Sequence, residues 1–271
     1  MSSRVTVALA PVDGERVLAN ATIVVGERMT AVIDAMFSPA MVAPVREEAE
    51  RLGGRRVGIV VLPHADPDHV LGLPAFPGAV VVATRRAADV LADPTVRRAY
   101  AELHDRFGGT SGAFAPPAVD VAFGDVGRID LGGLHLEAAL VGPAHSPADT
   151  LLWCPQERVA WSGDLVFNGV FPLVREGVER WLAGLDRLQG WAPTAVVPGH
   201  GMVAGAAIIE GQRRLLQALH DEIPALHAAR VPVDVAAAGV RFEAYRRVPL
   251  AGERIAGAVR GAYGALDRFG R

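Results

Sequence analysis

The strongest constraint on the fold is a short apolar segment that is followed at once by a dense set of polar side chains. Residues 57–62 read VGIVVL, a continuous apolar run that fits a strand buried on both faces of a sheet. Pro63 ends the run, and residues 64–69 read HADPDH. One turn at the end of a buried strand can direct these two His and two Asp side chains toward a common point. The segment therefore predicts a metal site at the edge of a sheet.

Further His and Asp residues follow later predicted strands. His145 lies in GPAHSPADT, Asp164 in WSGDLVF and His200 in VVPGHG, and each is flanked by the Gly, Pro or Ser residues of tight turns. Together with His64 and His69 of the HADPDH segment, His145 and His200 make four histidines, out of eight, that fall in strand-end loops. The others fall in helical or strand patterns and are expected to be surface or packed residues: His104, His135, His220 and His227.

The order of the predicted elements favours two mixed sheets over one alternating parallel sheet. Strands are predicted at 5–9, 17–25 and 30–33, a helix at 39–52, and a second set of strands between 119 and 162. Two mixed sheets packed face to face, with helices outside, accommodate this order best. The chain beyond residue 204 reads as two or three helices. The predicted breaks lie near Pro224, Val231-Pro232 and Pro249.

Composition excludes several classes of protein. The 271 residues carry 27 basic and 30 acidic side chains, a net charge of −3, which argues against a dominant nucleic-acid role. The single cysteine, Cys154, excludes an intrachain disulfide and a cysteine zinc cluster. There is no signal-peptide pattern and no apolar run of about 18 residues, so we expect a cytoplasmic chain with no membrane partner. We expect residues 1–271 to form one domain, with 205–271 as a helical extension. The extension could cap the site or form a homodimer face, and the alternative is solvent-exposed packing on the sandwich.

The four motifs HADPDH, GPAHSPADT, SGD and PGHG occur in the order that resembles the metallo-β-lactamase superfamily, over about residues 5–205. The resemblance implies an α/β fold: a four-layer αβ/βα sandwich of two mixed β-sheets flanked by helices, with the site at one edge. It implies that Asp34, which ends MTAVID, is a structural residue near the site. It implies the ligands of two metals: His64, Asp66 and His145 for the first, Asp68, His69 and His200 for the second, and Asp164 as the bridge.

Asp66 departs from the superfamily's usual HxHxDH motif, because it replaces the second histidine. A carboxylate there lowers the net positive charge of the site and favours harder ions such as Mn or Fe, although Zn²⁺ remains compatible. The iron-binding flavodiiron branch also has a carboxylate at this position. Because Asp is shorter than His, the first metal position could instead be weak or empty. We therefore expect one or two Zn²⁺ ions, with Fe or Mn as alternatives.

These features predict a metal-dependent hydrolase that uses a metal-bound hydroxide to cleave an ester, thioester, lactone, amide or related bond of a small molecule. Zinc can lower the pKa of bound water to about 7. Asp68 is the predicted catalytic residue, because it could orient the nucleophile as well as bind metal. Two alternatives remain open: an iron-dependent oxidoreductase of the same superfamily, and a degenerate, non-catalytic binding protein.

Two segments are candidates for substrate recognition. Residues 107–117 form a Gly-rich loop, and residues 167–174 read FNGVFPLV directly after the SGD motif. In the second segment Phe167 and Phe171 could form an apolar pocket wall, and Asn168 could donate a hydrogen bond to the substrate. The alternative is that these side chains pack under the following helix. Arg175 could meet an anionic group.

Overall fold

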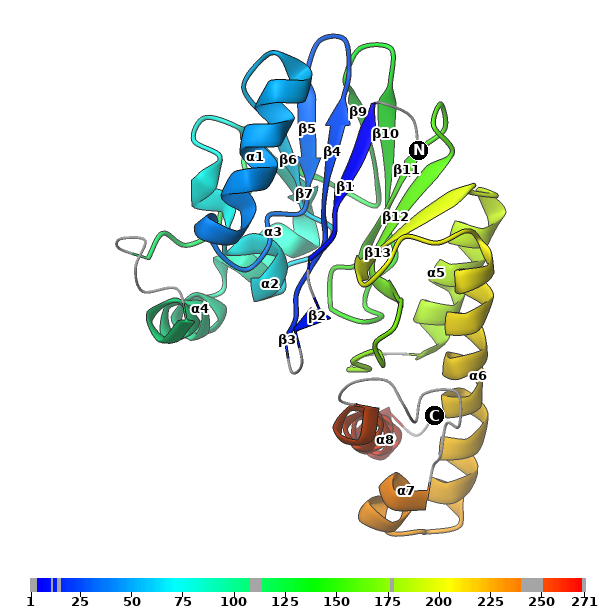
Figure 1. Cartoon of the computed structure of the whole chain (residues 1–271). Helices are drawn as coiled ribbons and strands as arrows, with labels where there is room; N and C mark the ends of the chain where they lie inside the picture. Colours follow the sequence, from blue (N-terminus) through cyan, green and yellow to red (C-terminus); the bar gives the residue numbers. More distant parts are fainter. Residues whose placement is uncertain are drawn as a thin grey trace.

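The computed structural model describes residues 4–10, 12–13, 16–107, 114–175, 178–239 and 251–269. Two mixed β-sheets pack face to face, and helices cover their outer faces (Figure 1). The predicted αβ/βα sandwich is therefore confirmed.

The first sheet has the strand order β1-β4-β5-β6-β7-β8. β4 pairs antiparallel with β1 and β5, whereas β5 through β8 run parallel. The strands are β1 (Val5–Ala8), β4 (Ala21–Val25), β5 (Thr30–Ile33), β6 (Ile59–Val61), β7 (Val80–Thr84) and β8 (Val121–Phe123). The predicted strand 17–25 is wrong as one strand. β3 (Arg16–Val17) pairs with β2 (Val12–Asp13), and the backbone N–H of Asn20 donates to the carbonyl of Gly199.

The second sheet has the order β13-β12-β11-β10-β9. β12 and β13 run parallel, and the other neighbours are antiparallel. The strands are β9 (Val126–Asp130), β10 (His135–Leu140), β11 (Thr150–Cys154), β12 (Val159–Phe167) and β13 (Ala195–His200). Every residue of β11 and β12 is buried, as expected for strands covered on both faces.

α1 (Pro39–Gly53) buries an apolar stripe, Val42, Val45 and Ala49, in the core beneath the first sheet. The helix begins at Ser38, whose hydroxyl accepts from the N–H of Met41, and ends at Gly54 in the left-handed conformation that glycine adopts easily. The helix predicted at 39–52 is thus confirmed, and it ends one residue later. The other helices before the C-terminal region are α2 (Pro67–Val70), the 3₁₀ turn η1 (Leu73–Ala75), α3 (Arg85–Ala92), α4 (Pro94–Phe107) and α5 (Val178–Gly190).

The C-terminal region consists of α6 (Ala207–Ala228), α7 (Val233–Gly239) and α8 (Ala251–Phe269). The predicted break near Pro224 is wrong. Pro224 lies on the exposed side of α6, and the buried Leu219 and Ile223 hold that part of the helix against the core. The break at Val231-Pro232 is confirmed, and Pro249 lies outside the described residues. No helix of the described chain is long and apolar enough to cross a membrane.

Candidate metal centre

The predicted ligands converge where the two sheets meet at one edge. His64 follows β6, Asp66 precedes α2, and α2 carries Asp68 and His69. From the second sheet, His145 lies in the loop between β10 and β11, Asp164 lies within β12, and His200 is the last residue of β13. The strand predicted to end at residue 162 thus continues to Phe167, and Asp164 and His200 lie within strands instead of after them. Apart from the partly exposed Asp66 and Asp68, these side chains are buried.

The side chains form three overlapping groups of possible ligands. One of them, His64, His69 and Asp164, shares a histidine with each of the other two. The first ligand group is His64, Asp66 and His145, and the second ligand group is Asp68, His69 and His200. Within each group, one potential ligand atom from every residue lies within 4.8 Å of the others. Asp66 thus reaches its group despite its short side chain. These two groups contain the residues of the two ligand sets that the resemblance implies, and their binding of metal stays a prediction.

Asp164 lies between the two groups. Its Oδ2 is 3.3 Å from His145 Nε2 in the first group and 3.2 Å from His200 Nε2 in the second. Its Oδ1 is 3.4 Å from His69 Nε2. One carboxylate therefore contacts both groups, as a bridging ligand would.

The state of the buried ligand atoms fits a divalent metal. Among the buried polar atoms without a hydrogen-bond partner are His64 Nε2, His69 Nε2 and Asp164 Oδ1. Buried polar atoms are rarely left unpaired, because their desolvation is costly. Imidazole nitrogens and carboxylate oxygens are ligands for Zn²⁺, Fe²⁺ and Mn²⁺. The residues present therefore fit the metal that the motifs imply.

A carboxylate behind the second ligand group fixes the orientation of His69. Asp34 Oδ2 lies in short contact with His69 Nδ1, and Asp34 Oδ1 accepts the N–H of Met36 at 2.9 Å. This arrangement leaves His69 Nε2 directed at the site, the usual outer-shell pattern of metal-binding histidines. The prediction that Asp34 is a structural residue near the site agrees with this geometry.

The loop that carries His145 is ordered by a different carboxylate. Asp149 accepts the N–H of Ser146 at 2.8 Å, its hydroxyl at 2.7 Å, and the N–H of Ala144 at 3.2 Å. His145 Nδ1 lies 2.8 Å from the carbonyl oxygen of Leu173, so Nδ1 carries the proton and donates. His145 Nε2 is left as the atom that faces Asp66 and Asp164.

The buried charges shift the pKa values of the histidines. For His69, burial acts to lower the pKa, but Asp34 and then Asp68 and Asp164 outweigh it, so the pKa is raised. Burial is likewise outweighed at His145 and His200, chiefly by Asp164, and both pKa values are raised. His64 differs, because burial and the neighbouring His69 lower its pKa well below the usual value. Protons therefore compete with a metal for most of these imidazoles.

Arg175 touches the first ligand group. Its Nη2 lies in short contact with Asp66 Oδ2 and 2.7 Å from His145 Nε2. Burial acts to raise the pKa of Asp66, but the hydrogen bond with His145 and the charges of His64 and Arg175 lower it overall. The anionic group that Arg175 meets within the described chain is thus the unusual carboxylate of the HADPDH motif.

The three predicted substrate-binding residues, Phe167, Asn168 and Phe171, contact other residues of the protein. The ring of Phe167 stacks on that of His200, with centroids 5.5 Å apart and planes at 8°. Asn168 Nδ2 donates to the carbonyl of Met202 at 2.7 Å. Phe171 has no exposed surface and packs in the core of the second sheet and its helices, which favours the packing alternative for this residue. In the other candidate loop, residues 108–113 lie outside the described residues.

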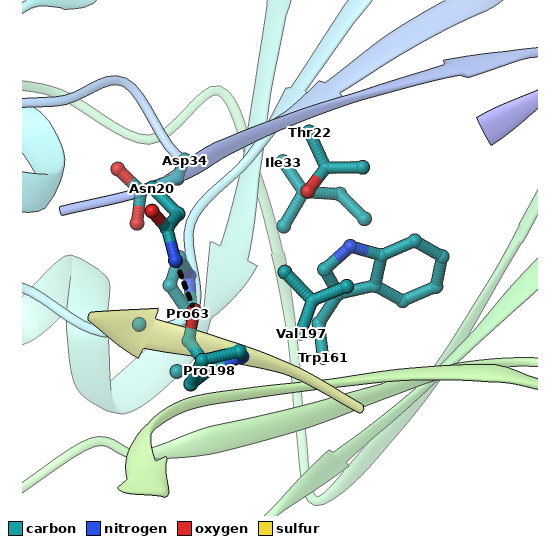
Figure 2. Close-up of a pocket in the computed structure, with 10 residues that line it drawn as sticks. Asn20, Thr22, Ile33, Asp34, Pro63, Trp161, Val197 and Pro198 are labelled. Atoms are coloured by element: carbon teal, nitrogen blue, oxygen red, sulfur yellow. Dashed lines mark hydrogen bonds between the residues drawn. The ribbon is translucent and has the colours of Figure 1, made fainter. Parts of the chain in front are cut away.

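Asn20 is a supporting residue that sequence reasoning missed. Its Nδ2 donates to the carbonyls of Pro198 at 3.0 Å and Gly201 at 2.8 Å, on both sides of His200. Asn20 and Asp34 line one small cavity (Figure 2). Its volume is about 20 Å³, which is space for about one water. Trp161 lines the same cavity, and its buried Nε1 has no hydrogen-bond partner. No local sequence signal distinguishes Asn20 from an ordinary turn residue.

Tyr100 is a second missed residue. It comes from α4, and its hydroxyl donates to the carbonyl of Ala65 at 2.5 Å, within the HADPDH turn. Burial raises the pKa of Tyr100, and the negative charges of Asp66 and Asp68 raise it further. The hydroxyl therefore stays protonated and remains a donor.

Comparisons with known proteins agree with this geometry. The family model of the metallo-beta-lactamase superfamily matches residues 14–200, whereas no curated protein matches the chain. A metallo-beta-lactamase from Pontibacter korlensis has 20% identity and a TM-score of 0.64, with 80% of this chain and 96% of that chain covered. The mono-zinc form of FIM-1 from Pseudomonas aeruginosa has 18% identity and a TM-score of 0.61, with coverages of 80% and 92%. The sec-alkylsulfatase Pisa1 from Pseudomonas sp. has 17% identity and a TM-score of 0.66, with coverages of 93% and 47%. At these identities the solved structures support the fold, and the family match shows that the chain belongs to the metallo-β-lactamase superfamily.

Proposed function

We propose that the chain is a metal-dependent hydrolase that cleaves an ester, thioester, lactone, amide or related bond of a small molecule. The observation that carries this proposal is the pair of ligand groups that share Asp164 and leave buried ligand atoms without hydrogen bonds. Superfamily membership supports the same class of reaction, since the similar structures are named as β-lactamases and an alkylsulfatase.

The two ligand groups and Asp164 would hold the metal, and a divalent ion there would supply Lewis acidity and lower the pKa of water. Asp68 is the proposed catalytic residue. Its side chain is 28% exposed, compared with 19% for Asp66, so it can accept a hydrogen bond from an incoming water. Phe167 covers one face of His200 and limits the access of bulk water to that imidazole.

The carboxylate of Asp66 is the observation that supports a second candidate. A third carboxylate beside Asp68 and Asp164 makes the donor set harder, which favours iron or manganese over zinc. An iron-dependent oxidoreductase of the same superfamily is therefore the alternative.

The test is metal content and activity measured on the same samples. Protein prepared with Zn, Mn and Fe in turn is analysed for bound metal and assayed against a panel of esters, thioesters, lactones and amides. We expect hydrolysis of at least one class, with both metal and activity reduced in Asp68→Asn and His200→Ala. Full metal content and normal turnover in these variants would refute the assignment. Oxygen consumption by the iron-loaded protein without hydrolysis would favour the alternative.

A further inference from the structure

A second arginine reaches the site region from the C-terminal helix. Arg254 lies in α8, and its Nη1 donates to the carbonyl oxygen of Phe171 at 2.7 Å. α8 packs against the same segment, because Ile255, Ala258 and Val259 share a core with Phe171. The helix therefore places a cation on the segment that also carries Arg175.

Arg254 is partly buried and lacks a counter-ion within the described chain. None of the described carboxylates lies within ion-pair distance of its guanidinium, and its hydrogen bond goes to a neutral carbonyl. Burial lowers the pKa of Arg254, while the more distant charges of Asp164 and Asp68 act in the opposite direction. A cation that is partly removed from water is costly unless it is paired. This position therefore suits an anion that arrives from outside.

Arg175 retains donors that the described structure does not use. Its contacts with Asp66 and His145 both involve Nη2, and Nε and Nη1 have no hydrogen bond to the described residues. Its side chain is 40% exposed, so these donors are accessible to solvent. The guanidinium is a planar fork whose remaining N–H groups can bind two oxygens of one anion.

We propose that Arg175 and Arg254 bind an anionic group of the substrate, namely an oxyanion such as a carboxylate, sulfate or phosphate. Arg175 lies on the segment that follows Asp164 and contacts Asp66, and Arg254 donates to the same segment, so an anion held by the two arginines lies beside the ligand groups. The assignment to a substrate rests on the proposed hydrolase function. It implies that neutral lactones and simple alkyl esters are poorer substrates than analogues that carry a negative charge.

The experiment is calorimetric titration of the zinc-loaded protein with sulfate, phosphate and acetate at constant ionic strength. Each charge-assisted interaction is expected to be worth about a tenfold change in Kd or more. We therefore expect Arg254→Met and Arg175→Met each to weaken the binding of the preferred anion by about tenfold. The matched control is Arg260→Met on the same helix, because Arg260 pairs with the exposed Asp234 at 3.1 Å. This control should bind as the parent does, and Arg254→Lys should retain part of the affinity.

Unchanged anion affinity in Arg254→Met and Arg175→Met would overturn the proposal, and so would an equal loss in Arg260→Met, which would reflect net charge only. Anion binding that disappears on zinc removal, yet is insensitive to Arg254→Met, would also overturn it. If Arg175→Met no longer binds zinc, the anion affinity of Arg254→Met alone decides whether the arginines bind the anion.

Elemental analysis and neutral-ester hydrolysis of the same samples separate this inference from the proposed function. Arginine-dependent anion binding in a chain that takes up no metal would refute the hydrolase and retain the anion site. Metal-dependent hydrolysis without arginine-dependent anion binding would support the hydrolase and refute the anion site.

Discussion

The two ligand groups contain the same kinds of side chain, but their surroundings differ. In the second group a buried carboxylate, Asp34, lies behind His69, and none of the described arginines contacts a member of the group. In the first group Arg175 contacts both Asp66 and His145. A set of ligand residues therefore does not by itself define the affinity of a site for a metal. A neighbouring carboxylate favours a cation, whereas a guanidinium in contact with the ligands opposes one. We therefore expect the second group to bind the first equivalent of metal.

The largest effect is expected from removing the residue that the two groups share. Asp164→Ala deletes the carboxylate that contacts His145, His69 and His200, so both groups lose affinity together. Hydrolysis should fall by roughly a thousandfold or more, because metal catalysis depends on a complete site. Elemental analysis together with a hydrolysis assay checks this result, and circular dichroism serves as the control for folding. If Asp164→Ala keeps one full equivalent of metal, one of the two groups binds metal without Asp164.

The next largest effect is the pH dependence of metal binding. A metal requires neutral imidazoles, and the pKa values of His69, His145 and His200 are raised in the metal-free protein. These groups therefore keep their protons to a pH above the usual histidine value of about 6.5, and zinc affinity should rise with pH through and beyond that value. Between about pH 8 and pH 5.5 we expect a loss of roughly a hundredfold or more in affinity, measured by competition with a chelating dye. Affinity that is constant over this range would contradict the assignment of the histidines as ligands.

Changing the supporting carboxylates tests the two groups separately. Asp34→Asn removes the charge behind His69 and should weaken metal binding at the second group by about 10- to 100-fold. The matched variant is Asp149→Asn, which acts on the loop of His145 and hence on the first group. We expect Asp34→Asn to raise the Kd of the more tightly bound metal equivalent and Asp149→Asn to leave that Kd nearly unchanged. The opposite ranking would reverse the order in which the groups fill.

The smallest expected effect comes from removing the cation that contacts the first group. Arg175→Met frees Asp66 Oδ2 and His145 Nε2 and removes a positive charge. The weaker metal equivalent should then bind about tenfold more tightly, since nearby like charges repel. Titration followed by elemental analysis measures the change, with Arg260→Met as the control. If that metal equivalent binds more weakly in Arg175→Met than in the parent, Arg175 supports metal binding at the first group instead of opposing it.

Much of the fold and the convergence of the ligands could be predicted from the sequence. Strands buried on both faces, such as residues 57–62, appear in the sequence as continuous apolar runs, and turn residues show where they end. Placing His64, His145 and His200 after such strands is enough to predict one shared edge. What the motif could not decide was whether Asp66 reaches its group, because that depends on the backbone of the turn before α2.

The supporting residues could not be predicted, because their contacts join distant parts of the chain. Asn20 bonds to Pro198 and Gly201, and Arg254 bonds to Phe171. A single sequence carries no periodic signal for such pairs. The break assigned near Pro224 failed for a related reason: the core packing of α6 offsets a local preference against proline in a helix.

Each ligand group draws residues from both halves of the sandwich. His64 and Asp66 follow a strand of one sheet and His145 follows a strand of the other, and α2 and β13 divide the second group in the same way. An ion held by either group would therefore act as a cross-link between the two halves. The chain has one cysteine and so no intrachain disulfide to do this. Metal uptake would then couple the unfolding of the two halves, and the loaded protein would unfold more cooperatively than the metal-free chain.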